Sequence, residues 1–319
     1  MRGYSVFALA LALTACAQPP LAKGPGGLGA AIKVDVVPVA LNPTDPTQTT
    51  LGNFRYAGGL VLTAKTTGRL HGLSDIKVAA NRSLVAVSDD GDLFRAKVVL
   101  DDLGRLSGLS DSSIAPLTGL DGQALQGKTE SDAEGLAILA NGDRLVSLER
   151  HDRILLYPAK GGPAKAAPMP DAVFPDNTGL EALSENPAAG PRAYMAGGEG
   201  SGQTWLCNVT SGCVTGHRLD KPDEYGLVAI APLSKGRLAY VLRAWDLMHG
   251  SRVMMVIEDA QGREIDRLTL EKPLTVDNLE GVAAVPGANG SIRFYLLSDD
   301  NFSPAQRTIL LAFDWKPTR

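Results

Sequence analysis

The sequence has few of the residues from which familiar catalytic and metal sites are built. It contains three cysteines and four histidines in 319 residues. The histidines, at positions 71, 151, 217 and 249, stand at no metal-ligand spacing. Gly-x-Ser-x-Gly, His-Glu-x-x-His and a phosphate-binding glycine loop are all missing. These absences argue against a serine-hydrolase elbow, a zinc-protease helix and a nucleotide-binding loop.

Positive charge is also sparse and scattered. The chain has 31 Lys and Arg against 35 Asp and Glu, a formal charge of -4, and no basic run. We therefore expect no nucleic-acid partner. Helical periodicity over long stretches is absent as well, whereas short apolar runs are frequent. The 44% apolar content is enough for a large core.

The only uncharged stretch near the N-terminus is too short to cross a bilayer as a helix. Arg2 precedes the apolar residues 6–13, which is typical of an export signal. The following Leu13-Thr14-Ala15-Cys16 resembles the bacterial lipobox, in which the cysteine is lipidated. The alternative is an ordinary secretory signal cleaved after Ala15.

The N-terminal pattern predicts three segments: a lipoprotein signal peptide (1–15), a flexible tether beginning at a lipidated Cys16 (16–31), and one domain (32–319). Acyl chains would be the only membrane attachment. We expect a monomeric periplasmic lipoprotein, with the outer membrane as the favoured anchor site. Export into an oxidising compartment also allows a disulfide between Cys207 and Cys213, which flank a plausible hairpin turn. Free thiols are the alternative.

Five related stretches recur at spacings of 44 to 63 residues. They are His71-Gly72-Leu73, Glu134-Gly135-Leu136, Glu181-Ala182-Leu183, Tyr225-Gly226-Leu227 and Glu280-Gly281-Val282. Each begins a unit of several short apolar runs separated by Gly, Asn and Asp, which is typical of a propeller blade. We predict an all-β propeller with five blades. Six blades would require residues 33–64 to form a further one; otherwise a strand from that segment pairs with the C-terminal blade.

The repeats also predict a site. The first strand of each blade lines the channel, so the residues just before it converge at one mouth, where the second strand also ends. Several carboxylates meet there, and a hard cation such as calcium would relieve their repulsion. The expected ligands are Glu134, Glu181, Glu280, Asp89, Asp299 and Asp300. The alternative is that these carboxylates cap turns and pair with arginines without binding a metal.

Several of these motifs resemble a bacterial family described as phytase-like proteins with esterase-like activity. The resemblance covers most of residues 54–315. It is carried by residues 70–73, 88–91, 132–136, 148–154, 177–183, 276–281, 297–302, 306–308 and 310–313. In one place the sequence departs from the family: Leu242 precedes Arg243, where the family usually has a glutamate. The resemblance therefore leaves Arg243 without its expected charge partner.

The resemblance implies a calcium-dependent propeller that hydrolyses a small-molecule ester or phosphoester without a nucleophilic side chain. The catalytic candidates are Glu134, Glu149, Arg150, Arg153 and His151, and the substrate-binding candidates are Arg243, Arg307 and Asn301. Two alternatives remain. One is a non-catalytic propeller that binds a ligand or partner; the other is a lactonase-like calcium propeller, which Asp277-Asn278 and Asp300-Asn301 would suit.

Overall fold

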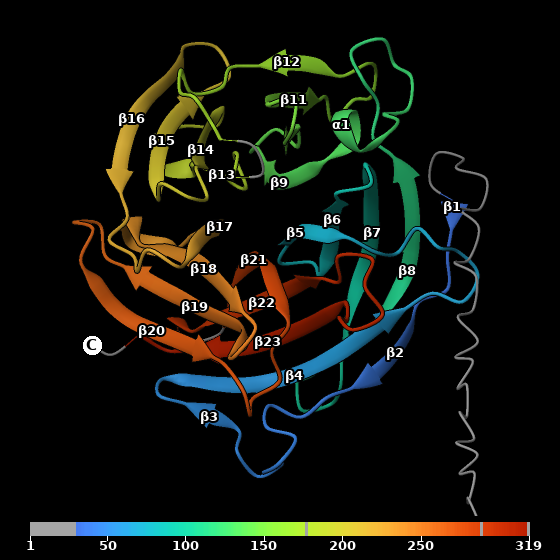
Figure 1. Ribbon diagram of the computed structural model, residues 1–319, viewed down its shortest axis with the longest axis vertical. Helices are drawn as coiled ribbons and strands as arrows, with labels where there is room; N and C mark the ends of the chain where they lie inside the picture. Colours follow the sequence, from blue (N-terminus) through green and yellow to red (C-terminus); the bar gives the residue numbers. More distant parts are fainter. Residues whose placement is uncertain (1–29, 176–177, 288–289, 318–319) are drawn as a thin grey trace, which may run out of the picture.

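Five antiparallel sheets surround a central axis in the computed structural model, which describes residues 30–175, 178–287 and 290–317 (Figure 1). Each sheet contributes one strand to an inner ring: β5 (Leu73–Val78), β9 (Ala133–Ile138), β13 (Ala182–Glu185), β17 (Gly226–Pro232) and β21 (Asn278–Pro286). Every inner strand contacts the inner strands of both neighbouring sheets, so the ring is closed. The predicted five-bladed all-β propeller is confirmed, and six blades are excluded.

The remaining strands follow outward from the inner ring. Blade 1 continues with β6 (Ser83–Ser88), β7 (Asp92–Leu100), β8 (Leu106–Pro116) and β1 (Ala30–Ala31). Blade 2 adds β10 (Arg144–Leu148), β11 (Arg153–Tyr157) and β12 (Lys165–Ala167). Blade 3 adds β14 (Ala193–Gly197), β15 (Gln203–Asn208) and β16 (Gly212–Arg218). Blade 4 adds β18 (Leu238–Asp246), β19 (Gly250–Glu258) and β20 (Glu264–Leu270).

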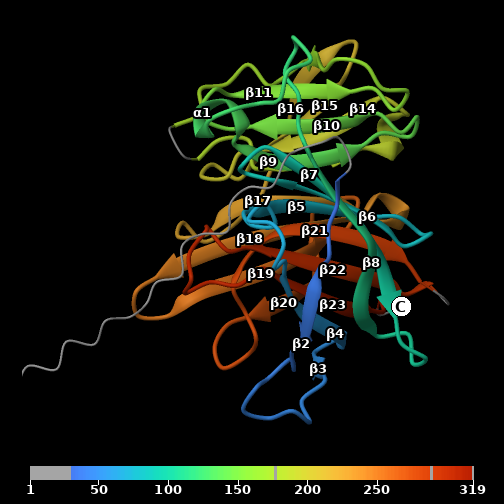
Figure 2. The same cartoon turned by 90° about the vertical axis from the view of Figure 1, so that its right-hand side faces the viewer.

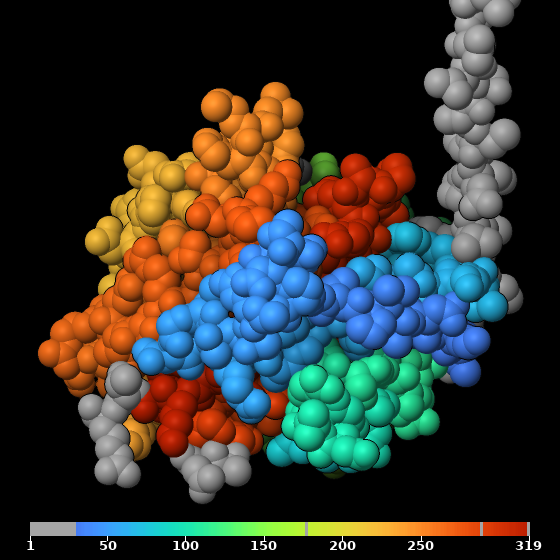
Figure 3. Space-filling view, turned by 90° about the horizontal axis from the view of Figure 1, so that it is seen from below, coloured from blue at the N-terminus to red at the C-terminus, as the bar shows by residue number. Residues whose placement is uncertain are grey.

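Blade 5 is built from both ends of the described chain. It adds β22 (Ile292–Asp299), β23 (Ile309–Trp315), β4 (Phe54–Thr63) and β2 (Asp35–Pro38), with β3 (Thr50–Leu51) paired to β4. Seen from below, the blue N-terminal segment lies against the red C-terminal segment (Figure 3). The expectation that an early strand completes the C-terminal blade is confirmed. Ala30 and Ala31, assigned to the tether from the sequence, pair with β8 instead.

Two of the hairpin turns are held by the same pattern of hydrogen bonds from an aspartate side chain to backbone amides. In the turn between β7 and β8, Asp101 Oδ1 accepts hydrogen bonds from the amides of Leu103 and Arg105. The turn between β19 and β20 repeats this arrangement around Asp259. In both turns the residue before the arginine is a glycine with a φ of 73°, a conformation that glycine adopts without strain.

The hydrophobic core is divided into five clusters, one between each pair of neighbouring blades. The cluster between blades 4 and 5 contains Phe54, Phe294, Phe313 and Trp315. Because Phe54 comes from β4 and Trp315 from β23, this cluster joins the two chain ends. Burial of apolar surface at every blade interface therefore stabilises the closed ring.

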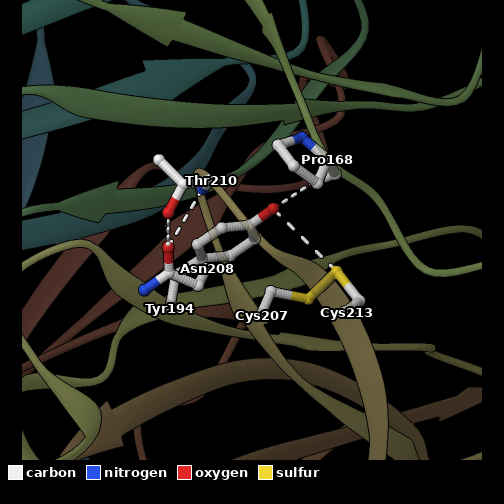
Figure 4. The surroundings of a disulfide bond; sticks show 6 residues. All are labelled: Pro168, Tyr194, Cys207, Asn208, Thr210 and Cys213. Carbon is white, nitrogen blue, oxygen red and sulfur yellow. Dashed lines mark hydrogen bonds between the residues drawn. A yellow bond between two sulfur atoms is a disulfide. The ribbon is translucent and has the colours of Figure 1, made fainter.

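Helical structure is minor. It comprises α1 (Lys128–Ser131) and the 3-10 turns η1 (Pro187–Ala189) and η2 (Ser234–Gly236). None of the described helices is long and apolar enough to span a membrane. The predicted disulfide is present between Cys207 on β15 and Cys213 on β16, with an S–S distance of 2.06 Å (Figure 4).

Ring closure through β4 makes a testable prediction. Leu60 is fully buried and pairs with Leu310 across the joint, so we expect Leu60→Ala to lower the free energy of unfolding by about 2–5 kcal/mol. Leu103, which is 73% exposed on a hairpin turn, provides the control Leu103→Ala, with an expected change below about 0.5 kcal/mol. Urea denaturation measures both. Equal stabilities of the two variants would contradict this account of closure.

Candidate functional site

A pocket of about 580 Å³ lies at one mouth of the central channel, and we call it the acidic pocket. Its lining residues are Asp89, Asp90, Lys128, Asp132, Glu134, Glu149, Arg150, Glu181, Arg243, Glu280, Asp299, Asn301 and Phe302. Eight of these are carboxylate residues and three are cationic. The predicted meeting of first-strand starts and second-strand ends at one mouth is therefore observed.

Bulges in the inner strands help to present two of the carboxylates. In β21, Leu279 pairs with Ser298 and Gly281 with Leu297, so Glu280 is the extra residue. In β9, Glu134 and Gly135 together face Ser147. A bulge redirects a side chain that regular alternation would orient otherwise. Gly135 is needed here, because a Cβ at its position would come within 2.5 Å of the Glu181 carbonyl oxygen.

Blade 1 contains the same bulge as blade 5, but the residue at the bulge is not the one that the sequence repeats predicted. Leu73 pairs with Ser88, as Leu279 pairs with Ser298 in blade 5, so Ser74 takes the position of Glu280. The sequence comparison had placed His71 there. His71 instead lies before β5, with its Nδ1 2.7 Å from Asp300 Oδ2.

Arg243 at the end of β18 is the central cation of the acidic pocket. Its Nη1 donates to Glu280 Oε1 and, at 2.8 Å, to Asn278 Oδ1, while Nη2 donates to Glu199 Oε1 at 2.9 Å. Nη2 also lies 3.9 Å from Glu181 Oε2. The expectation that Arg243 lacks a charge partner is therefore wrong. Its partners come from the neighbouring blades and not from the residue before it.

A second ion-pair network surrounds Asp132, which is almost fully buried. Lys128 Nζ on α1 lies 2.5 Å from Asp132 Oδ1 and from Asp89 Oδ2. Arg150 Nε donates to the other Asp132 oxygen, Oδ2, at 2.5 Å. Both oxygens of Asp132 thus face a cation, Lys128 on one side and Arg150 on the other.

Other carboxylate oxygens of the acidic pocket have no such partner among the described residues. Asp89 Oδ1 is buried without a hydrogen bond. Asp132, Glu134 and Glu149 each offer an oxygen, and these oxygens lie within 4.8 Å of one another. Glu149 Oε1 accepts a hydrogen bond from the Gly179 amide at 3.0 Å, which leaves Oε2 available. An all-oxygen group of this kind suits calcium or magnesium.

Three predicted site residues lie away from the acidic pocket. Asp300 does not line it; its oxygens accept hydrogen bonds from the Gly72 and Phe302 amides and the Thr308 hydroxyl, and contact His71. His151 and Arg153 line a separate depression and contact Glu130. Both belong to the hairpin beside α1.

The predicted substrate-binding residues Arg307 and Asn301 lie at a neighbouring pocket of about 810 Å³, which we call the side pocket. It shares Asn301 and Arg243 with the acidic pocket, so the two are adjacent. Arg307 Nε donates to Asp277 Oδ2 at 3.2 Å.

In the view turned by 90°, α1 and the β18–β19 hairpin lie toward the same side of the ring, opposite the C-terminus (Figure 2).

Two residues of the ion-pair networks were given no role from the sequence: Asp132 and Lys128. Asp132 stands two residues before Glu134 in the most regular repeat, and that spacing was the available signal. Lys128 lies on a four-residue helix outside the repeats. No sequence pattern predicts its approach to Asp89.

A family model described as "Phytase-like: Esterase-like activity of phytase" matches residues 68–302. The chain belongs to this family. The match spans the inner strands of all five blades and all of the acidic-pocket residues. No curated protein matches the chain.

Solved structures similar to this phytase-like chain share little sequence with it. A protein assigned as a gluconolactonase has 12% identity and a TM-score of 0.48, over 94% of this chain and 96% of that one. A streptogramin B lyase has 12% identity and a TM-score of 0.44, over 88% and 98%. Virginiamycin B lyase from Staphylococcus aureus has 7% identity and a TM-score of 0.43, over 89% and 100%. At these similarities no activity is transferred from them.

Burial raises the pKa of several carboxyl groups at the mouth. It raises the pKa of Asp299 to about 8, aided by the nearby charges of Glu280 and Asp89. Burial also raises the pKa of Glu280 to about 7, against the opposing effect of Arg243. The pKa of Glu134 lies well above its usual value, because burial and the charges of Glu181 and Glu280 disfavour ionisation. Without a further cation, several of these groups hold protons near neutral pH.

These shifts predict a pH dependence of stability in EDTA. Between about pH 4 and pH 8 the folded protein binds more protons than the unfolded chain, so the free energy of unfolding falls as the pH rises. Asp299→Asn keeps a carbonyl oxygen for the Asn301 amide and removes one titrating group. We expect it to stabilise the protein by at least about 1 kcal/mol at pH 8 and to have little effect at pH 4.

Denaturation curves at several pH values measure this difference. Asp171, which is exposed, provides the control Asp171→Asn, whose effect should not depend on pH in this way. A stability of Asp299→Asn that runs parallel to that of the unmodified protein from pH 4 to pH 8 would contradict the assignment of Asp299 as a protonated mouth carboxyl.

Proposed function

We propose that this protein hydrolyses carboxylic or phosphoric esters at the acidic pocket, assisted by a bound divalent cation, calcium. Membership of the phytase-like family supports a hydrolase that acts on ester bonds. The observation that carries the metal-assisted form is the charge imbalance: eight carboxylate residues line a pocket with three cationic ones. Repulsion of that size favours a bound cation.

The residues present fit such an ion. Glu134 and Glu149 lie close to each other and to Asp132, and each has an oxygen with no hydrogen bond among the described residues. Asp89, which lies outside this group, has a buried oxygen without a hydrogen bond to a described residue. Calcium held by the oxygens of Asp132, Glu134 and Glu149 would supply positive charge that polarises the scissile ester and lowers the pKa of water. Asp300 is not among the proposed ligands, because its oxygens are already hydrogen-bonded.

Attack by water is the reaction that suits this lining. No serine, threonine, cysteine or histidine is among the described residues that line the acidic pocket. A covalent intermediate on such a side chain therefore has no support. Glu134 faces the pocket and makes no hydrogen bond to a described side chain or amide, so we assign it the role of accepting a proton from the attacking water.

The two arginines of the acidic pocket have different proposed roles. Arg243 is surrounded by Glu280, Glu199 and Glu181, and its burial makes it a fixed counter-ion for them. Arg150 is more exposed, with 42% of its side chain accessible. We therefore assign the binding of the ester's developing oxyanion to Arg150, whose guanidinium can form charge-assisted hydrogen bonds.

A direct assay tests the activity. We expect the purified protein to release 4-nitrophenol from 4-nitrophenyl acetate or 4-nitrophenyl phosphate when calcium is present, and to lose this activity in EDTA and regain it when calcium is added back. A δ-lactone in the same assay tests the lactonase-like alternative. Absence of hydrolysis of all three substrates, with calcium, would reject the hydrolase and favour the non-catalytic binding propeller.

Glu134→Gln tests the metal site separately from catalysis. A ligand that binds only the folded state adds about 2.7 kcal/mol of stability at one hundred times its dissociation constant. We expect calcium to raise the melting temperature of the unmodified protein, and Glu134→Gln to reduce this rise. The control is Glu271→Gln, at an exposed position outside both pockets. A melting temperature that does not respond to calcium or EDTA would reject the metal site.

We also propose that the protein is an exported, monomeric lipoprotein of the periplasm, anchored through acyl chains on Cys16, with the outer membrane favoured. The proposal rests on the lipobox-like residues 13–16, which lie outside the described residues. The disulfide between Cys207 and Cys213 supports an oxidising compartment. Mass spectrometry of the N-terminus from the native host checks it: a diacylated or triacylated Cys16 is expected, and an unmodified N-terminus at Ala17 or later would reject lipidation.

A further inference from the structure

The side pocket has a composition that the proposed chemistry does not explain. It lies between the β17 and β18 ends of blade 4 and the loop that connects β22 to β23 in blade 5. Through Arg243 and Asn301 it borders the acidic pocket. A molecule whose ester group reaches the acidic pocket would place its remaining part here.

An exposed tryptophan forms part of the side-pocket wall. Trp245 on β18 is 62% exposed, whereas Trp205 and Trp315 are 8% and 1% exposed. An exposed indole in a pocket wall offers a flat apolar face on which a ligand can stack, together with an N–H donor. Trp245 is the only tryptophan of this chain that lines a described pocket as an exposed side chain.

Hydrogen-bonding groups without partners share that wall. The side chains of Asn301, Gln306 and Ser251 line the side pocket and make no hydrogen bond to other described residues. Lys272 lines it and forms no ion pair with another described residue; its Nζ lies 3.2 Å from where a Cβ of Gly250 would stand. Because Gly250 has no side chain, the ammonium group can lie next to the turn end of the β18–β19 hairpin, which carries Trp245.

We propose that the side pocket binds a neutral polyhydroxylated ring, a sugar or cyclic polyol. This ring is the alcohol half of the ester that is cleaved, a statement that rests on the proposed function. The C–H face of such a ring stacks on the negative face of an indole. Its hydroxyl groups both donate and accept, which matches the mixture of amides, hydroxyl and ammonium around Trp245.

Two other ligand classes fit the side pocket less well. An apolar acyl chain would need apolar walls, but Val276, Ala244 and Ala305 are the aliphatic residues among a mainly polar lining. A polyanion would need an excess of positive charge. The three cationic residues Arg243, Lys272 and Arg307 are matched in number by three carboxylate residues, Glu199, Glu224 and Asp277.

Tryptophan fluorescence provides a test that needs no ester. Methyl α-glucopyranoside, methyl β-galactopyranoside, N-acetylglucosamine and myo-inositol are titrated into the full protein in the millimolar range, with cyclohexanol as a ring without the hydroxyl pattern. We expect at least one of the four to change the emission saturably and cyclohexanol not to. Isothermal calorimetry under the same conditions measures the affinity independently of fluorescence.

Variants locate the binding. Trp245→Ala should weaken the calorimetric affinity at least about tenfold, the effect of losing about 1.4 kcal/mol, while Trp245→Phe retains a flat ring and should recover part of it. Gln306→Ala should weaken binding less. Leu247→Ala is the matched control, because Leu247 is 91% exposed on the same hairpin and lines neither pocket. Its affinity should equal that of the unmodified protein.

The outcomes separate this inference from the proposed function. If none of the four probes binds by either measurement, or if Trp245→Ala binds as tightly as Leu247→Ala, the sugar subsite is rejected, whether or not esters are hydrolysed. If a probe binds at Trp245 but no ester is cleaved, the subsite stands as a binding site and the hydrolase is rejected. If both hold, acetylated derivatives of the bound sugar should be cleaved with a higher kcat/KM than ethyl acetate, and Trp245→Ala should remove that preference.

Discussion

The hydrogen-bonded joint between β4 and β23 is the constraint on which the rest of the molecule depends. A five-sheet ring leaves two free edges until these strands pair, and the aromatic cluster around Phe54 and Trp315 stabilises the pairing. With the ring closed, the inner strands converge on one axis. Glu134, Glu181 and Glu280, which are far apart in the sequence, then meet at one pocket.

This convergence brings together more negative charge than a partly buried site tolerates alone. Cations of the protein itself neutralise part of this charge. Arg243 forms ion pairs with glutamates of blades 3 and 5, and Lys128 forms ion pairs with both Asp89 and Asp132. The remainder raises the pKa of Glu134 and Asp299, because burial and like charges disfavour ionisation. Protons and the divalent cation proposed above would therefore compete for the Glu134 oxygens. This competition connects the stability of the fold to the chemistry proposed for its mouth.

The two pockets divide the mouth into regions of different character. The acidic pocket is strongly charged, and the described residues that line it include no serine, threonine, cysteine or histidine. The side pocket has Trp245 and unpaired polar groups, and it is shaped by the long β18–β19 hairpin and the loop after β22. Loops and hairpin tips vary more readily than blades, since they bear little of the inter-blade core. In this family fold, selectivity for the ligand is therefore expected to reside on the rim and reactivity in the channel.

The sequence by itself determined the all-β propeller, the five blades, the disulfide and the mouth positions of Glu134, Glu181, Glu280, Asp89 and Asp299. These follow from repeats and strand periodicity, which are local and recur in the chain. It did not determine the register of blade 1, where Ser74 takes the position of Glu280. The letters of His71-Gly72-Leu73 match the repeat three residues before the position that strand pairing assigns. The tertiary structure alone decided the partners of Arg243, the role of Lys128 and the presence of Trp245 and Lys272 in one pocket lining. Those contacts join different blades or distant loops, and nothing in the local sequence encodes the distance between side chains that meet only after the ring has closed.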